Sequence, residues 1–195
     1  MVADDQKLTF EEYLTSEEGS DTRYELVKGE LVPVSREAGL HALIIDFLMD
    51  QFEAAFSDLA GTYQVLSGSV GVRSPKGGRW DTSRIPDITI LPAAQIKAMA
   101  DREAVIDYNE PPPILVAEVV SPSTKTADYR AKRLEYNYLA IPEYWIVDPL
   151  SSKVTICSLE DELYSLLECR EEDSISSLIF PSLSLTADQV LAGGV

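Results

Sequence analysis

Residues 114–123 read ILVAEVVSPS, an apolar run that carries one acidic residue, Glu118, near its centre. Apolar side chains stand on both sides of this glutamate, which is typical of a β-strand buried on both faces. An ionised carboxylate in such a strand is costly unless a partner compensates its charge. The candidate partners are a metal ion, a lysine or arginine, or water in a cleft at the strand end. Which of them is present decides the function.

The chain has the size and composition of one globular domain, which we expect to extend over residues 1–195. It contains 45% hydrophobic and 25% charged residues, which is ordinary for a folded domain. No apolar stretch approaches the roughly 20 residues that cross a bilayer, and the first residues lack a signal-peptide pattern. Two cysteines, Cys157 and Cys169, suit free buried thiols in a reducing compartment. We therefore expect a cytoplasmic protein without a membrane segment.

The net charge of the chain is −17, from 16 basic and 33 acidic residues. This balance argues against a protein that coats nucleic acid non-specifically, because phosphate binding depends on lysine and arginine. The basic residues are unevenly distributed, however, with ten of the 16 between Arg73 and Arg133. They indicate either a solvated surface or a basic rim around one site on an acidic body.

The sequence patterns predict an α/β fold, more fully an α+β arrangement with one central mixed sheet flanked by helices. Helices are predicted from residue 9, over 38–56, from 91, over 128–139 and over 186–192. Strands are predicted over 23–32 (a hairpin turning at 28–29), 63–73 (a strand pair), 86–91, 114–120, 143–149 and 154–169 (a hairpin), and a loop over 74–84. The unit from 114 to 149 is long enough for a parallel strand–helix–strand crossover.

A pair of carboxylates is the strongest candidate for chemistry. If the strands over 86–91 and 114–120 are neighbours, side-chain alternation brings Asp87 and Glu118 toward one point. An aspartate and a glutamate, with a backbone carbonyl (that of Val119) and waters, suit Mg²⁺ or Mn²⁺. Such an ion activates water and neutralises charge on a phosphodiester. The alternatives are a turn residue for Asp87 and a buried salt bridge for Glu118.

Lys132 is the third candidate, on the helix predicted to follow Glu118. From its first turns a lysine reaches back over the strand, where it could orient the attacking water or hold the scissile phosphate. The alternative is a solvated helix charge. Tyr136 lies four residues later on the same helix face, where it could cover the ammonium stem or hydrogen-bond nearby. Asp128 is expected to cap the helix.

Together these segments resemble one family. The motifs are YELVKGEL at 24–31, His41 on a helix, PDITIL at 86–91, EVVSPST at 118–124, the spacing Asp128-x-x-x-Lys132-x-x-x-Tyr136, and IPEYWIVDP at 141–149. They are similar to the Uma-two family, described as "putative restriction endonucleases" within the PD-(D/E)XK nuclease superfamily. The resemblance spans about residues 8–191.

The resemblance implies a restriction-endonuclease-like core with a divalent metal held by Asp87 and Glu118. It also implies that Glu25 is a further acidic member of the site, although an exposed hairpin charge is the alternative interpretation. His41 matches the family pattern, but a lone histidine on an apolar helix is more often a core residue. The superfamily places a lysine two positions after the glutamate; here that position is Val120, and Lys132 would supply the ammonium.

The leading hypothesis is a metal-dependent endonuclease that cleaves DNA rather than RNA, with Asp87, Glu118, Lys132 and Glu25 in its site. The alternative is a catalytically inactive nuclease-fold module that binds protein or nucleic acid. A third idea is a structural dimer packed through the apolar helix over 38–56. A homodimer is also compatible with the leading hypothesis, because two sites can cut two strands.

Overall fold

The computed structural model describes residues 7–16, 23–34, 39–56, 62–76 and 79–195. One sheet contains β1 (Tyr24–Val27), β2 (Glu30–Pro33), β4 (Gly71–Lys76), β5 (Arg79–Arg84) and β7 (Val105–Ile106), in the order β2-β1-β5-β4-β7. The other contains β3 (Tyr63–Ser67), β6 (Ile88–Pro92), β8 (Leu115–Val119), β9 (Glu143–Asp148), β10 (Lys153–Glu160) and β11 (Leu163–Cys169), in the order β11-β10-β9-β8-β6-β3. The helical elements are α1 (Phe10–Ser16), α2 (Gly39–Ala55), α3 (Ala93–Ala98), the π-helical segment η2 (Ala127–Lys132), α4 (Arg133–Tyr138) and α5 (Ala187–Leu191).

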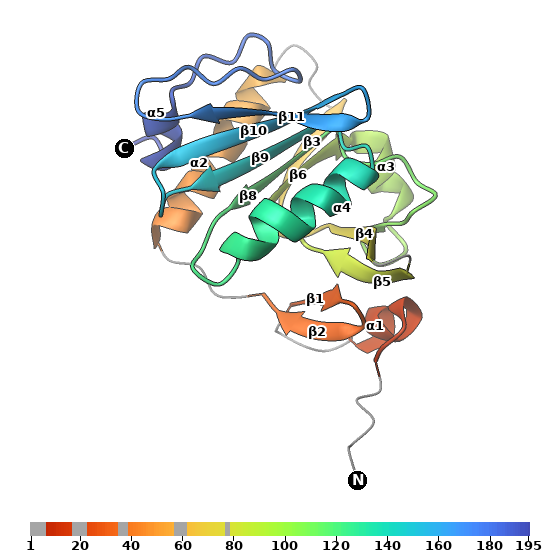
Figure 1. Ribbon diagram of the computed structural model, residues 1–195. Helices are drawn as coiled ribbons and strands as arrows, with labels where there is room; N and C mark the ends of the chain where they lie inside the picture. The colour runs from red at the N-terminus through yellow and green to blue at the C-terminus, as the bar shows by residue number, and fades with distance from the viewer. Residues whose placement is uncertain (1–6, 17–22, 35–38, 57–61, 77–78) are drawn as a thin grey trace.

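The strands thus form two mixed sheets, and the prediction of one central sheet is wrong. Each sheet combines antiparallel pairs with a parallel one, β4 with β7 and β8 with β9. The broader prediction, a mixed α/β fold with helices against a sheet, is confirmed (Figure 1).

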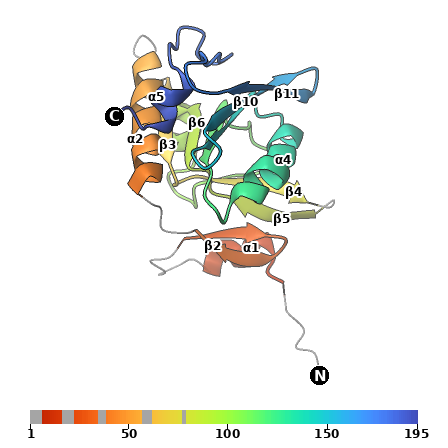
Figure 2. The same cartoon turned by 60° about the vertical axis from the view of Figure 1, so that its left-hand side comes forward.

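Helices cover both faces of the larger sheet. Helix α2 lies on one face with α5 beside it, and α4 lies on the other (Figures 1 and 2). Phe52 of α2 packs edge-on against Trp145 of β9, with ring centroids 5.2 Å apart. Both side chains are fully buried, and burial of a large apolar side chain stabilises a fold by about 1.5–3 kcal/mol. This double cover explains why the central strands β8 and β9 carry buried apolar side chains on both of their faces. Residue 38, the predicted first residue of this helix, lies outside the described residues.

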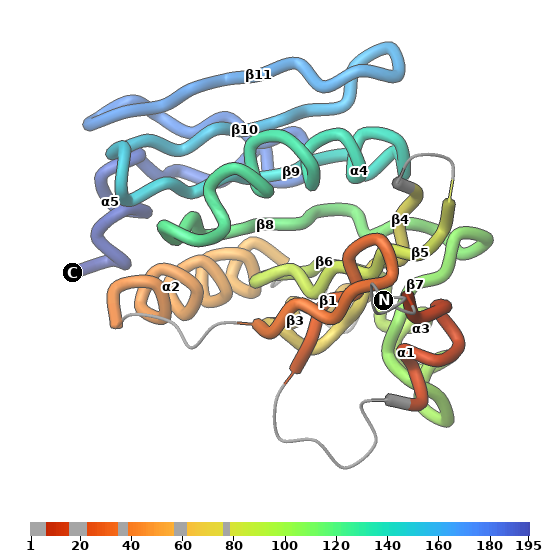
Figure 3. The backbone as a smooth tube through the Cα atoms, turned by 60° about the horizontal axis from the view of Figure 1, so that its bottom comes forward, coloured from red at the N-terminus to blue at the C-terminus, as the bar shows by residue number. Residues whose placement is uncertain are grey.

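The predicted crossover is confirmed. Strands β8 and β9 run parallel, and the chain between them forms η2 and α4 (Figure 3). Helical structure begins at Lys125. The first named segment has π-helical hydrogen bonding, which inserts residues relative to an α-helix and is frequent at functional sites. The β10–β11 hairpin forms one edge of the same sheet, with β11 as the edge strand (Figure 3).

Two local predictions around the smaller sheet are wrong. Residues 63–73 do not form a strand pair, because β3 joins the larger sheet and β4 the smaller one. Gly68, with φ +51°, lies at the crossing, and its amide donates a hydrogen bond to the Asp87 carbonyl. Residues 74–84 were expected to be a loop, yet most of them belong to the antiparallel pair β4 and β5.

The N-terminal hairpin follows the prediction. Strands β1 and β2 pair around Lys28 and Gly29, whose φ values are +55° and +81°, as a type I′ turn requires. Leu26 of β1 pairs with Ser83 of β5. The hairpin therefore extends the smaller sheet beside the end of β5 (Figure 1).

The remaining predictions concern the membrane and the cysteines. Among the described helices, each is too short or too polar to span a membrane. Cys157 and Cys169 are both buried free thiols.

Candidate active site

The register of the larger sheet sets the two predicted carboxylates opposite each other. Strands β6 and β8 are antiparallel neighbours, as predicted, with Ile88 opposite Ala117. Continuing this register by one residue places Asp87 opposite Glu118. Residues that face each other directly in an antiparallel pair point to the same side of the sheet. Both carboxylates therefore lie at one end of the strand pair.

The partners of Glu118 are a lysine and a tyrosine. Its side chain is 3% exposed, and its Oε2 lies 2.8 Å from Lys132 Nζ. Its Oε1 accepts a hydrogen bond of 2.8 Å from the Tyr136 hydroxyl. Burial raises the pKa of Glu118 well above its usual value, and the Lys132 charge opposes that rise. For Lys132, burial alone would lower the pKa, but the surrounding carboxylates raise it, so the ammonium stays charged.

Asp87 lies beside Glu118 and is held by a backbone amide and by His41. Its Oδ2 accepts a hydrogen bond of 2.7 Å from the Val119 amide and lies 3.3 Å from His41 Nε2. His41 is therefore next to the site. Both of these contacts involve the same carboxylate oxygen of Asp87, Oδ2. The contact recorded for Val119 is through its amide, and its carbonyl as a metal ligand stays a prediction.

Glu25 reaches the same site from the N-terminal hairpin. Its side chain is 12% exposed, and Oε1 lies 3.8 Å from Lys132 Nζ. The same oxygen accepts a hydrogen bond of 3.2 Å from the Ile85 amide. Oε2 accepts one of 3.0 Å from Arg84. The interpretation of Glu25 as an exposed hairpin charge is therefore wrong.

Asp128 does not cap the helix, so this prediction is wrong. It lies inside η2, is buried, and its Oδ1 is 3.1 Å from Lys132 Nζ, four residues later. Burial raises the pKa of Asp128, and the Lys132 charge opposes the rise. The helical turn thus contributes both an acid and its cation to the interior.

Two site residues escaped the sequence analysis, Arg84 and Glu135. The Arg84 guanidinium forms hydrogen bonds of 2.8 and 3.0 Å with the two carboxylate oxygens of Glu135 on α4. Arg84 belongs to the segment expected to be a loop. The available signal was its position two residues before the Pro86-Asp87 pair.

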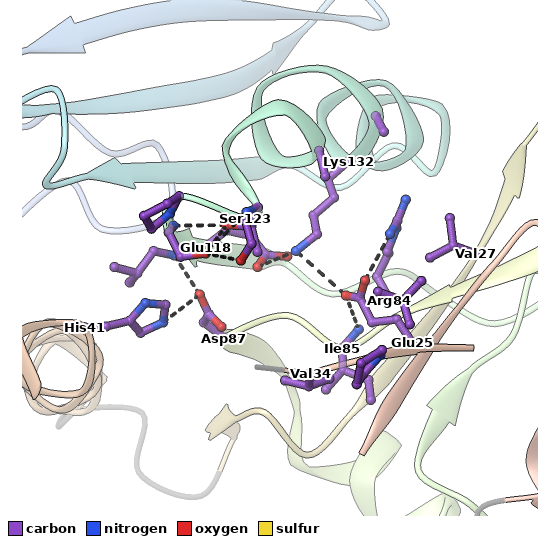
Figure 4. A pocket seen from close by; sticks show the side chains of 18 residues that line it. Glu25, Val27, Val34, His41, Arg84, Ile85, Asp87, Glu118, Ser123 and Lys132 are labelled. Atoms are coloured by element: carbon purple, nitrogen blue, oxygen red, sulfur yellow. Dashed lines mark hydrogen bonds and ion pairs between the residues drawn. The ribbon is translucent and has the colours of Figure 1, made fainter. Parts of the chain in front are cut away.

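The carboxylates border a cavity of about 540 Å³. Figure 4 shows Glu118, Asp87, Lys132 and Glu25 pointing toward a common space. One wall consists of hairpin and β5 residues, the other of the turn after β8 and the start of the helix; apolar wall residues include Val27, Val32, Pro33, Val34, Ile85, Ala127 and Ala131.

Negative charge exceeds positive charge around this cavity. The carboxylates that line it are Glu25, Asp87 and Glu118, beside the cations Lys132 and Arg84. Asp128 and Glu135 contact these two cations from outside the lining. Of the basic residues clustered between Arg73 and Arg133, these two line the cavity. Several others form ion pairs elsewhere, so the described residues do not form the suggested basic rim.

The donor set fits a hydrated magnesium or manganese ion better than a structural metal. Among the described residues, no group of three or more histidine, cysteine, aspartate or glutamate side chains is arranged to hold a metal ion. Mg²⁺, however, is commonly bound by one or two carboxylates with several waters. Each carboxylate offers about four lone pairs, so the contacts of Asp87 and Glu118 leave some for a cation. The excess of negative charge favours one.

Comparison with known proteins places the chain among proteins described as "Putative restriction endonuclease", with residues 10–188 matched. This is the Uma2 family, and the chain belongs to it because the match covers most of its length. A search of curated proteins found no match.

A solved structure has the same fold. It is that of a protein from Anabaena variabilis ATCC 29413, described as a "putative nuclease belonging to DUF820". The TM-score is 0.76 at 15% sequence identity, over 96% of this chain and 99% of the other.

Proposed function

We propose that the protein is a Mg²⁺- or Mn²⁺-dependent endonuclease with a restriction-endonuclease-like core, which hydrolyses phosphodiester bonds of DNA in the cytoplasm. One observation carries the proposal: Asp87 and Glu118 stand opposite each other at the cavity, with the Lys132 ammonium 2.8 Å from Glu118. Membership of a family described as putative restriction endonucleases supports the same substrate class.

Each residue has a role that follows from its contacts. Asp87, Glu118 and the Val119 carbonyl would hold the metal ion. The ion, when bound, supplies charge neutralisation and a more acidic water. Lys132 would hold the scissile phosphate or orient the attacking water, because its ammonium remains charged beside the carboxylates. A charged hydrogen-bond donor such as this ammonium stabilises a transition state most strongly in a site from which water is excluded.

Three side chains would support these groups. Tyr136 fixes one oxygen of Glu118 by its hydrogen bond. His41 contacts Asp87. Glu25 lies within 3.8 Å of the Lys132 ammonium, and would keep it near the cavity when substrate binds.

Plasmid cleavage with Mg²⁺ or Mn²⁺ tests this proposal. We expect Asp87→Asn, Glu118→Gln and Lys132→Met each to lower the rate by on the order of 100-fold or more. The matched control is Asp107→Asn, which removes a carboxylate paired with Arg73 outside this cavity. Equal rates in wild type and the three site variants would reject the proposal. An RNA of the same sequence tests the preference for DNA.

A catalytically inactive module that binds protein or nucleic acid is the second candidate. It is favoured by Glu118, whose two oxygens already have Lys132 and Tyr136 as partners, and by Val120 in the usual lysine position. Calorimetry separates the candidates. The inactive module predicts no heat when Mn²⁺ is added, whereas binding that is lost in Asp87→Asn supports the enzyme.

We also propose a homodimer, which would let two sites cut two DNA strands. Helix α2 supports it, because Leu40 and Leu43 are 45% and 48% exposed while Ile44 and Leu48 pack inward. Light scattering should give twice the 21.5 kDa of one chain. A mass of one chain at micromolar concentration would reject it.

A further inference from the structure

Arg84 lies between two carboxylates that belong to different parts of the fold. It is the last residue of strand β5, and its side chain is 4% exposed. Nε and one terminal nitrogen bind both oxygens of Glu135, and the other terminal nitrogen binds Glu25 Oε2 at 3.0 Å. A guanidinium has a rigid planar fork that suits two-point contacts of this kind. Arg84 therefore fixes the position of one carboxylate relative to the other.

The carboxylate on the inner side is itself fixed. The Ser74 hydroxyl of β4 also contacts Glu135 Oε2, at 3.3 Å. Glu135 lies three residues after Lys132 in the continuous helical segment, and its side chain is 4% exposed. The β4–β5 pair thus holds the same helical segment that carries the lysine of the site.

The carboxylate on the outer side is fixed by two consecutive residues. Arg84 binds Glu25 Oε2, while the Ile85 amide binds Oε1. The latter oxygen is the one that lies 3.8 Å from Lys132 Nζ. Figure 4 shows Glu25 between Arg84 and Lys132. The geometry of Arg84 therefore sets how close Glu25 comes to the ammonium.

We infer that Arg84 is a positioning residue of the site: by joining Glu25 to Glu135, it holds the Glu25 carboxylate against Lys132. The inference rests on the proposed function for its effect on catalysis. Its structural content, that Arg84 controls the surroundings of the Lys132 ammonium through Glu25, does not depend on catalysis. If Arg84 had only a structural role, its ion pairs would stabilise the fold, but its replacement would not change the surroundings of the Lys132 ammonium.

A double-mutant cycle on plasmid cleavage tests the catalytic part. We expect Arg84→Met and Glu25→Gln each to lower kcat by on the order of 10- to 100-fold, as a displacement of about 1 Å in a site can do, with a smaller change in KM. The double variant should be no slower than the slower single variant, because both changes disrupt one unit. Losses that multiply would overturn the inference.

Two further variants separate positioning from folding. Arg84→Lys keeps the charge but lacks the fork, and should recover only part of the rate; it also replaces Arg84→Met if that variant does not fold. Arg73→Met is the matched control, since Arg73 is a largely buried arginine whose ion pair with Asp107 lies outside the cavity. It should change thermal stability but leave kcat within about twofold.

The ammonium resonance of Lys132, observed by ¹⁵N NMR of lysine-labelled protein and assigned with Lys132→Arg, tests the structural part. Arg84→Met, or Arg84→Lys if necessary, and Glu25→Gln should each shift this resonance, whereas Arg73→Met should not. An unchanged resonance in the Arg84 variant overturns the inference. If the wild type cleaves no DNA, the proposed function fails, and the resonance still decides whether Arg84 positions Glu25.

Discussion

Replacing Lys132 by methionine tests whether the interior depends on this one cation. The side chain keeps its length and apolar contacts, but Glu118 and Asp128 lose an ammonium at 2.8 and 3.1 Å. Both carboxylates are almost completely buried. Removing one partner of a buried ion pair costs roughly 3–5 kcal/mol, because the remaining charge stays desolvated. We expect a loss of this size in the free energy of unfolding at pH 8.

The loss should become smaller as the pH falls. Without Lys132, the pKa of Glu118, already raised by burial, rises further. A carboxyl group whose pKa is higher in the folded state binds more protons there than when unfolded, so stability falls as the pH rises above the unfolded value of about 4.3. Each such group contributes a slope of up to about 1.4 kcal/mol per pH unit. The variant should therefore recover part of its stability between pH 8 and pH 5.

Urea unfolding, followed by the fluorescence of the fully buried Trp145, measures this effect. The matched control is Lys153→Met, which removes a lysine from a pair with the half-exposed Glu168 and should cost about 1 kcal/mol or less. Adding Glu118→Gln to Lys132→Met should restore part of the loss. A loss below about 1 kcal/mol, or one that is equal at pH 5 and pH 8, would refute the reasoning.

Three other predictions each concern one side chain. Tyr136→Phe removes the hydroxyl that donates to buried Glu118 and should lower the unfolding free energy by about 1–3 kcal/mol in urea; an unchanged value would contradict the contact. Glu143→Ala removes the carboxylate that anchors the C-terminal segment through several hydrogen bonds. It should lower the free energy of unfolding by about 3 kcal/mol and accelerate limited proteolysis after residue 173. An unchanged rate of proteolysis would contradict the role of Glu143 as an anchor. Burial alone would raise the pKa of Asp148, but hydrogen bonds, that from Lys125 first, lower it below its usual value. The stability of wild type relative to Asp148→Asn should therefore be constant from pH 5 to 8 and decrease below about pH 4. A stability advantage of wild type that increases in acid would contradict this prediction.

The sequence was sufficient for the carboxylate pair, because strand alternation carries that information. An acid within the apolar run of β8 and another at the start of β6 face each other once the strands are neighbours. The N-terminal hairpin and the crossover were likewise predictable, from turn residues and from length.

The β4–β5 pair was not predictable, because its buried side chains are polar. Thr82, Ser83 and Arg84 are all buried, so the apolar alternation that usually reveals a strand is missing. Hydrophobicity gives no indication that Arg84 has carboxylate partners, since these come from β1 and α4. The division into two sheets was missed for a related reason, as Gly68 reads as an ordinary hairpin turn.

The π-helical part of the helical segment after β8 could not be predicted from the sequence either. Asp128 has the residue type and position of a helix cap, and only the observed hydrogen bonding shows it to be internal. Its partner Lys132 has an ordinary helical spacing of four residues. Whether such a pair faces solvent or the interior depends on the sheet beneath it.

Glu25, Arg84 and Lys132 come from positions scattered over more than half of the chain and meet only when the N-terminal hairpin has docked on β5. A growing polypeptide that has made its first hundred residues still lacks the lysine. A hydrolase built in this way would stay harmless during its own synthesis, and would become competent only after its last contacts between distant segments had closed.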